Sequence, residues 1–354
     1  MSANTKISWC DASWNPWIGC EKVSAGCKNC FAAVSTPARA FSVKWGGPRR
    51  RSAPATFNAP LRWNQRPWIC DECGYDMTTP ESKMYGLHLG TQLVKCPTGL
   101  HAVRHHRRRV FALSLGDWLD ADVPTIWLVD MLNVIRRCPN LDFLLLTKRP
   151  ENWSSRLQQA WAFKDSMPMD TINWIKDWVY DDQPPPNVWL GVSVEDQESA
   201  DQRIPLLLET PAALRFVSFE PALGPVDFHS RLMWGQPENG QAHPGLSWLI
   251  IGGESGTGAR PFDVGWARET LRQCRSAGVA CFIKQLGSHP IHSLPKNSAG
   301  WTDFPCRLKD RKGADPTEWP AELRVREFPT STPRPSLKES RARMVVENLA
   351  CNPA

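Results

Sequence analysis

The sequence predicts an α/β fold in which parallel strands and helices alternate as a βα barrel, closed or partial. Six short apolar runs recur along the chain, each followed by a polar or glycine-rich turn and usually by a helical stretch. The runs are continuous rather than alternating, as a parallel sheet buried on both faces requires. Repeated strand–helix units of this length favour the barrel, with a doubly wound open sheet as the alternative.

The predicted strands share a core of Val, Ile, Leu, Phe or Trp. They are residues 111–116 (FALSLG), 143–148 (FLLLTK), 188–194 (VWLGVSV), 214–220 (LRFVSFE), 248–254 (WLIIGGE) and 281–286 (CFIKQL). Two helices are predicted in detail. One has Pro124 as its first helical residue and runs toward Pro139. The other begins after Asp263 as N-cap and ends near Gly278 as C-cap.

Two segments interrupt this alternation and one follows it. Residues 65–109 hold several Cys and His and look like an insertion between the first unit and the second. Residues 164–186 predict a loop or a small second insertion, since they include three consecutive prolines. Residues 289–354 are rich in Pro, Lys and Arg and predict a peripheral extension. The barrel is therefore assigned to residues 5–288.

The composition is that of a soluble globular protein: 354 residues, 42% apolar. No apolar run approaches the roughly 18–20 residues that span a bilayer, so we expect no membrane association. The first ten residues are polar and do not resemble a secretory signal. We therefore expect a reducing cytoplasm, where disulfides do not account for 12 cysteines.

The net charge of +6 is concentrated in basic runs at residues 48–51 and 104–109. Clusters of Lys and Arg contact phosphate backbones, because counterion release favours them on nucleic acid. Two solvated basic loops are the alternative interpretation. The 18 Trp are more simply core or interface residues than base-stacking platforms.

The strongest chemical signal is a run of three cysteines, Cys20, Cys27 and Cys30, spaced Cys-x6-Cys-x2-Cys on a loop with two glycines. Three thiolates this close along the chain can converge on one metal centre. A four-iron cluster held by three cysteines leaves one iron open to S-adenosylmethionine, and the cofactor then carries the radical chemistry. The alternative is structural zinc, with Cys10 as a fourth thiolate.

A second group of metal-ligand residues lies in the insertion. Cys70 and Cys73 form a CxxC pair, and Cys96 and His101 follow. This set predicts a small structural zinc knuckle, in which His105 or His106 could replace His101. A second iron–sulfur cluster and no metal at all are the alternatives.

Polar residues at the carboxyl ends of the predicted strands are the remaining site candidates, because ligands collect there in a barrel. Those predicted to bind a cofactor are Ser114, Asp117, Lys148, Ser193, Gly252, Gly253 and Glu254. Those predicted to be catalytic are Glu195, Glu220 and Lys284. A satisfied polar network at the barrel mouth is the alternative for each of them.

Several motifs together resemble the phage and bacterial three-Cys-motif family, which is related to radical-SAM enzymes. The resemblance begins with TKISWCDASWNPWIGCEKVSAGCKNCFA at residues 5–32. It continues at 114–118 (SLGDW), 146–153 (LTKRPENW), 187–197 (NVWLGVSVEDQ), 215–227 (RFVSFEPALGPVD), 248–261 (WLIIGGESGTGARP), 282–287 (FIKQLG) and 308–329. It covers most of residues 5–329 apart from the two insertions.

The resemblance implies a radical-SAM-like partial barrel whose 4Fe-4S cluster is held by Cys20, Cys27 and Cys30, with S-adenosyl-L-methionine as cofactor. Some family members act in phage thymine hypermodification, where a glycyl group on the base is rearranged from an N-linked to a C-linked adduct. An isomerase of this kind needs a reducing electron donor and DNA or a modified thymidine nucleotide, in the host cytoplasm if the chain is phage-encoded. The Cys-x6-Cys-x2-Cys spacing is longer than the Cys-x3-Cys-x2-Cys common among radical-SAM enzymes.

Two further functions remain as alternatives. A DNA-lesion lyase would use the same cluster on a damaged pyrimidine. A zinc-stabilised nucleic-acid-binding protein without catalysis would use the cysteines for structure alone, and its binding would weaken steeply with salt.

Overall fold

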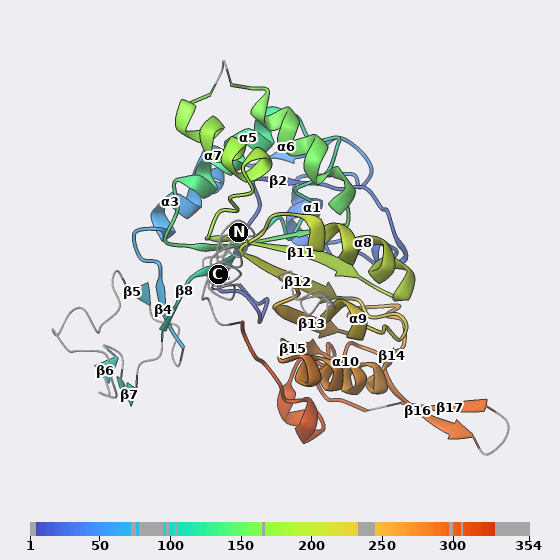
Figure 1. Ribbon diagram of the computed structural model, residues 1–354. Coiled ribbons are helices and arrows are strands. Elements are labelled where there is room, and N and C mark those ends of the chain that lie inside the picture. The colour runs from blue at the N-terminus through green and yellow to red at the C-terminus, as the bar shows by residue number, and fades with distance from the viewer. Residues whose placement is uncertain are drawn as a thin grey trace, which may run out of the picture.

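The main sheet contains seven parallel strands in chain order and curls into a half-barrel (Figure 1). The computed structural model describes residues 5–71, 76–77, 95–96, 99–102, 105–164, 167–232, 245–296, 300–305 and 307–329. The strands of the main sheet are β1 (Ala12–Trp14), β9 (Arg109–Ala112), β10 (Asp142–Thr147), β11 (Val188–Val194), β12 (Leu214–Phe219), β13 (Trp248–Gly252) and β15 (Ala280–Gln285). A doubly wound sheet reverses its strand order, so the sequential order excludes that alternative.

All six predicted strands are confirmed, with small differences at their ends. The first of them ends at Ala112 rather than continuing to 116, because Leu113 has a positive φ of 63° and leaves the extended conformation. β1 was not predicted from the sequence, because a strand of three residues is too short to produce a periodic signal.

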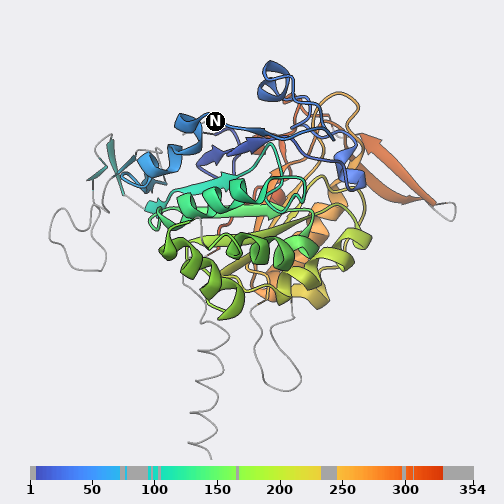
Figure 2. The ribbon, with the colours of Figure 1, turned by 90° about the horizontal axis from the view of Figure 1, so that it is seen from above.

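Helices cover the convex face of the sheet, as the green and yellow-green layer in Figure 2 shows. The longer ones are α5 (Thr125–Arg136), α6 (Trp153–Trp161), α7 (Met169–Tyr180), α8 (Gln197–Glu209) and α10 (Val264–Ala277). In α10, Asp263 caps the first turn by accepting a 2.7 Å hydrogen bond from the amide of Gly265, and Gly278 ends the helix at a φ of 64°. No helix in the described part of the chain is long and apolar enough to cross a membrane.

Two helix predictions need correction. Pro124 is not the first residue of α5 but its N-cap, so the helix begins at Thr125. Residues 164–186 are not only a loop, because they contain α7. The buried side chains of Ile172, Ile175 and Trp178 recur at helical spacing and pack it against the core, which outweighs the prolines that follow.

The described residues also form several short helices and strands. Near the N-terminus these are β2 (Trp17–Ile18), η1 (Ala25–Cys27), α1 (Thr36–Ala40), β3 (Arg50–Arg51), α2 (Pro54–Phe57) and α3 (Ala59–Trp63). The insertion contributes β4 (Trp68–Cys70), β5 (Asp76–Met77), β6 (Lys95–Cys96), β7 (Gly99–Ala102) and β8 (His105–Arg107). Later elements are η2 (Pro150–Asn152), α9 (His229–Leu232), β14 (Phe262–Asp263), β16 (Pro290–Lys296), β17 (Gly300–Pro305), η4 (Pro316–Glu318) and η5 (Ala321–Leu323). The β16–β17 hairpin projects away from the body (Figures 1 and 2).

The concave face of the sheet changes character along each strand. On β12 the inward positions run Leu214, Phe216, Ser218, and on β15 Phe282 is followed by Lys284. Since side chains alternate with period two, these residues share one face. The amino-terminal half of the concave face is therefore apolar, and the carboxyl-terminal half is polar.

An aromatic plug fills the apolar half. It consists of Trp9, Phe111, Trp189, Phe216, Trp248, Phe282 and Phe328. The ring centroids of Trp9 and Phe111 lie 4.5 Å apart, and those of Trp248 and Phe328 lie 5.4 Å apart. Gly191 makes room for it, because a Cβ there would lie 2.4 Å from the ring of Phe216. The space beside the plug lies toward the carboxyl ends of the strands.

Residues 307–329, the edge segment, run along the exposed edge of β15. The amide of Ile283 donates to the carbonyl of Val325, and the amide of Glu327 donates to the carbonyl of Cys281. Trp319 and Leu323 are buried in the main core. This part of the chain beyond residue 288 is therefore integral to the core rather than peripheral, and it covers a sheet edge that would otherwise be open to pairing.

Phe328→Ala is expected to destabilise the protein by about 2 kcal/mol, because it removes ring contacts with Trp248 and Phe282. Phe31→Ala is the matched control, since that ring is 57% exposed and should change the free energy of unfolding by under about 0.5 kcal/mol. Urea unfolding measures both. Equal losses for the two variants would show that Phe328 does not contribute to the core.

Stability should also depend on Asp142, where burial raises the carboxyl pKa from 3.8 to about 6 despite the positive charges of Arg107, Arg109 and His106. Because the folded-state pKa is raised, the contribution of this group is lost as the pH rises through about 6. Asp142→Asn should therefore stabilise the protein by about 2 kcal/mol more at about pH 8 than at about pH 4.5. Urea unfolding at both pH values measures this, and a stability difference between variant and wild type that does not change with pH would contradict it.

Candidate functional site

A cavity of about 570 Å³ opens at the carboxyl ends of the strands, above the aromatic plug. Its volume lies in the range of small-molecule sites. The predicted site residues that line it are Cys20, Cys27, Cys30, Ser114, Asp117, Lys148, Ser193, Glu220, Gly253, Glu254 and Lys284. Gly252 and Glu195 do not line it. Eight of the ten residues that the strand-end rule selected therefore line this cavity.

The cysteine loop, residues 19–32, is held at its start by Arg149. One nitrogen of this guanidinium donates to Cys20 Sγ at 3.4 Å and lies 3.2 Å from Asp117 Oδ2, while the other donates to the carbonyl of Glu21 at 3.1 Å. Asp117 also accepts hydrogen bonds from the hydroxyl of Thr147 and the amide of Lys148. The end of β10 thus fixes the first cysteine of the loop.

Glu195 holds the middle of the loop from beneath. Its carboxylate accepts a 2.9 Å hydrogen bond from the hydroxyl of Ser24, and it forms ion pairs with Lys148 and Arg203. The side chain is buried, which raises the carboxyl pKa, but the two cations outweigh this and lower it overall. Glu195 thus positions the loop in this structure, and its predicted catalytic role stays a prediction.

Gly26 lies directly against this carboxylate. A Cβ at this position would be 2.5 Å from Glu195 Cγ. The close approach of backbone to a buried acid explains why the loop has a glycine one residue before Cys27.

Glu254 and Arg260 hold the end of the loop. Glu254 accepts a 3.0 Å hydrogen bond from the side-chain Nδ2 of Asn29, and it pairs with Arg260 at 2.6 Å. Arg260 in turn donates to the carbonyl of Ala25 at 2.8 Å. The cysteine loop is thereby fastened to residues that follow β10, β11 and β13.

The thiols of the loop differ in their surroundings. Burial raises the pKa of Cys20 to about 11, with the negative charge of Asp117 adding to the effect. Burial acts in the same direction on Cys27, but hydrogen bonds at Val23 and Ser24 and the charge of Lys148 outweigh it, so the pKa of Cys27 is lowered. Of these two thiols, Cys27 is therefore the one that more readily forms a thiolate.

The donor chemistry of this cavity suits a thiolate-bound cluster, because three thiols from one anchored loop share its lining with Lys148 and Arg149. Two of the three sulfur atoms have protein partners. Cys20 Sγ contacts the carbonyl of Glu21 and the guanidinium of Arg149, and Cys27 Sγ lies 3.7 Å from the hydroxyl of Ser24. Within the described ranges, no three His, Cys, Asp or Glu side chains are gathered closely enough to hold a metal ion.

Cys10 does not join the other three cysteines at the cavity. It is buried beside Trp9 at the aromatic plug, and its thiol lies 3.8 Å from the carbonyl of Ile7. Burial raises its pKa far above the ordinary value. This placement does not favour the alternative in which Cys10 completes a four-thiolate zinc site.

Glu220 and Lys284 form an ion pair on the cavity wall. Glu220 directly follows β12, and Lys284 belongs to β15. Both are partly exposed to the cavity, at 18% and 21%. Gly252 backs this pair, with a Cβ position 3.6 Å from the Glu220 carboxyl carbon. Of the three residues predicted as catalytic, these two face the space where a ligand would lie.

The zinc knuckle predicted in the insertion stays a prediction. Cys70 is buried at the end of β4, Cys73 lies outside the described residues, and Cys96 and His101 belong to β6 and β7. The alternative ligand His106 has other contacts, since its ring nitrogens lie 2.5 Å from Asp71 and 2.9 Å from Asp11.

Several residues that line the main cavity come from outside the strand ends and were not predicted from the sequence. They are Lys6, Phe31, Trp45, Lys312 and Arg326. Lys6 precedes β1, and the last two belong to the edge segment. The motif at 308–329 was the available signal, because it appeared in the family resemblance without an assigned role.

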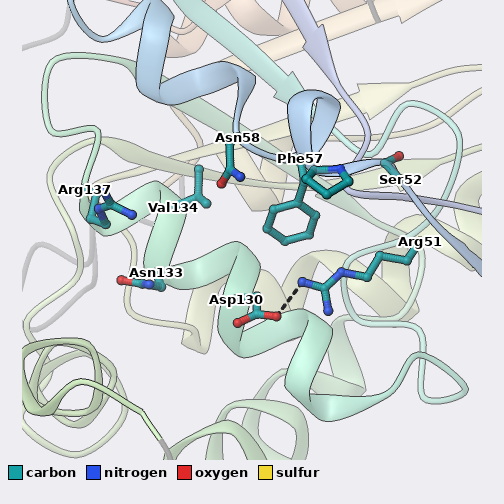
Figure 3. Close-up of a pocket in the computed structure, with 9 residues that line it drawn as sticks. Arg51, Ser52, Phe57, Asn58, Asp130, Asn133, Val134 and Arg137 are labelled. Atoms are coloured by element: carbon teal, nitrogen blue, oxygen red, sulfur yellow. Dashed lines mark hydrogen bonds and ion pairs between the residues drawn. The ribbon is translucent and has the colours of Figure 1, made fainter.

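A second cavity, of about 390 Å³, lies on the outer side of the fold between α2 and α5 (Figure 3). Arg51 and Asp130 form an ion pair of 2.5 Å across it, and Phe57 lies beneath the Arg51 guanidinium. None of the predicted site residues lines this cavity.

Gly26→Ala tests the contact between the cysteine loop and Glu195. The added methyl group should displace the loop, lower stability by about 1–3 kcal/mol and increase thiol reactivity in the folded protein. Gly224→Ala is the control, because the nearest atom to its Cβ position is 4.0 Å away. Urea unfolding and the rate of reaction with a thiol reagent measure the two effects. Identical behaviour of both variants would mean that the loop tolerates the methyl group.

Comparison with known proteins identifies the family of the chain. The chain matches no curated protein and no solved structure. One family model matches residues 4–303, which is most of the chain and includes the cysteine loop and every strand of the main sheet. The chain therefore belongs to the family described as "Protein of unknown function (DUF5131)".

Proposed function

We propose that this protein is a radical-SAM-type iron–sulfur enzyme that isomerises a glycyl-modified thymine from the N-linked to the C-linked form. The observation that carries the iron–sulfur part is the cysteine loop. Its three thiols line one cavity at the carboxyl edge of a half-barrel, and three separate strand ends hold the loop in place. A purely structural metal site would not need to face a ligand-sized cavity.

Cys20, Cys27 and Cys30 would hold the 4Fe-4S cluster, with S-adenosyl-L-methionine bound beside it in the cavity. When bound, these groups supply one-electron reductive cleavage of a sulfonium, which ends in methionine and 5′-deoxyadenosine. The lowered pKa of Cys27 favours its thiolate as a ligand. Lys148 and Arg149 supply positive charge beside the thiolates.

The chain contributes positioning and shielding. Trp9 and Phe111 of the aromatic plug also line the cavity, so the plug shields that side of the cavity from water. Glu220 and Lys284 face the cavity as a pair, so a carboxylate acceptor and an ammonium donor are both available to hydrogen-bond a substrate group. The polar groups of Ser193, Ser218 and Gln285 supply hydrogen bonds on the same wall.

The substrate assignment rests on the family resemblance. A thymine in duplex DNA would have to leave the base stack to reach this cavity, as for other enzymes that act on bases. The enzyme would also need a reducing electron donor, in keeping with a reducing cytoplasm. Eight of the described cysteines are free thiols.

Anaerobic reconstitution with iron and sulfide should give a brown protein, and Cys27→Ala should lose most of its visible absorbance. Cys138→Ala is the matched control, because this buried thiol lies before β10 at the opposite end of the sheet. Retained absorbance in Cys27→Ala, or colourless wild-type protein with stoichiometric zinc, would overturn the cluster assignment.

Incubation of the reconstituted enzyme with reductant and S-adenosylmethionine tests the reaction. 5′-Deoxyadenosine should form, and DNA that carries glycyl-modified thymine should yield the C-linked isomer. Product from lesion-containing DNA alone would favour the lyase. Nucleic-acid binding without any 5′-deoxyadenosine would favour the non-catalytic alternative.

A further inference from the structure

The cations of the main cavity fall into two groups. Lys148, Arg149 and Lys284 are each paired with a carboxylate, of Glu195, Asp117 and Glu220 respectively. Lys6, Lys312 and Arg326 also line the cavity, but none of them forms an ion pair with any residue that the structure describes. The charges of the first group are balanced by carboxylates of the protein, whereas the second group has no such partner among the described residues.

The available cations lie at the solvent side of the cavity. Lys6, Lys312 and Arg326 are all exposed. Lys312 and Arg326 come from the edge segment, where Arg326 donates to the carbonyl of Ala314 at 3.4 Å, so the two belong to one local surface. We call Lys6, Lys312 and Arg326 the cationic rim.

Nearby acids form no ion pair with the rim among the residues that the structure describes. Asp310 and Asp315 are the acids nearest to Lys312 along the chain. Asp310 accepts a hydrogen bond from the amide of Ala314, and Asp315 accepts hydrogen bonds from the amide and hydroxyl of Thr317. Glu21 lines the cavity without an ion pair among the described residues, but it belongs to the cysteine loop beside Cys20. Positive charge at the rim is therefore left for an anion to bind.

An exposed aromatic ring lies at the same cavity. Phe31 lines it and is 57% exposed, which is unusual for so large an apolar side chain. It follows Cys30 directly, so its position is tied to the anchored loop. Cations together with an exposed aromatic ring are the combination that binds single-stranded nucleic acid, since the cations contact phosphates and the ring stacks on a base.

We propose that the cationic rim binds phosphate groups of a nucleotide substrate, and that Phe31 stacks on a base next to the one that enters the cavity. This inference rests on the proposed function, because it names the form in which the thymine is presented. The group that the rim recognises is a phosphate, and either a DNA strand or a free nucleotide could supply it. Several separated cations favour the strand, because a mononucleotide offers one phosphate group.

The test is binding of a fluorescent single-stranded thymidine oligonucleotide, measured against salt concentration and without cluster reconstitution. Lys312→Glu should weaken binding about tenfold and lower the salt slope by about one. Lys309→Glu is the matched control, because Lys309 is exposed on the same segment but does not line the cavity. Phe31→Ala should weaken binding about tenfold, and Phe31→Leu should also weaken it if stacking is the cause.

Competition distinguishes the sources of phosphate. Thymidine 5′-monophosphate that displaces the labelled strand at comparable concentration would assign the rim to a free nucleotide, whereas much weaker displacement would assign it to DNA. Thymidine lacks a phosphate, so it should displace the labelled strand from the wild type and from Lys312→Glu at the same concentration. Equal loss in Lys312→Glu and Lys309→Glu, or no binding by the wild type, would overturn the inference.

The outcome is separable from that of the proposed function. Rim-dependent binding without 5′-deoxyadenosine formation in the reconstituted enzyme would leave the phosphate site standing and the radical reaction refuted. Formation of 5′-deoxyadenosine together with DNA binding that does not depend on the rim would support the radical reaction and refute the phosphate site.

Discussion

The candidate site depends on one buried carboxylate. Glu195 has no exposure to water, and burying its charge is tolerable only because Lys148 and Arg203 pair with it and Ser24 donates to it. The same carboxylate touches Gly26, so the shape and charge of the loop's middle are set by a residue that follows β11. Removing one partner would leave an unpaired charge in the core, which is far more costly than losing an exposed ion pair.

The division of the concave face explains why the loop lies where it does. Apolar residues on the amino-terminal half let the aromatic plug pack without water, and polar residues on the carboxyl-terminal half need partners. The loop supplies some of those partners, and the ion pair of Glu220 and Lys284 supplies others. The concave-facing positions of the same strands thus supply the apolar packing at one end of the sheet and the polar groups at the other.

The main features of the fold were predictable because they come from local patterns. Continuous apolar runs identified six strands of the parallel sheet, and the capping residues Asp263 and Gly278 marked both ends of α10. The strand-end rule found the cavity residues for the same reason, since parallel strands bring their carboxyl ends to one edge. The burial of Glu195 could not be predicted, because its polar type and its position after a strand suit a cavity-lining residue equally well, and its partners come from distant segments.

What the sequence did not predict depends on contacts between distant segments. Nothing local to Phe328 or Arg326 indicates that they meet β13 and β15, because those contacts join residues far apart in the chain. The short strand β1 was missed for a related reason, since three residues are held in place by pairing with β9 rather than by their own propensity.

The edge segment has a consequence for how the protein is made. Residues 307–329 are synthesised after every strand of the main sheet, yet they cover the free edge of β15 and contribute Lys312 and Arg326 to the cavity wall. A nascent chain that has released all seven strands from the ribosome therefore still has an open sheet edge and an incomplete cavity. Any group that needs a closed, water-poor site can be retained only after translation has passed this segment.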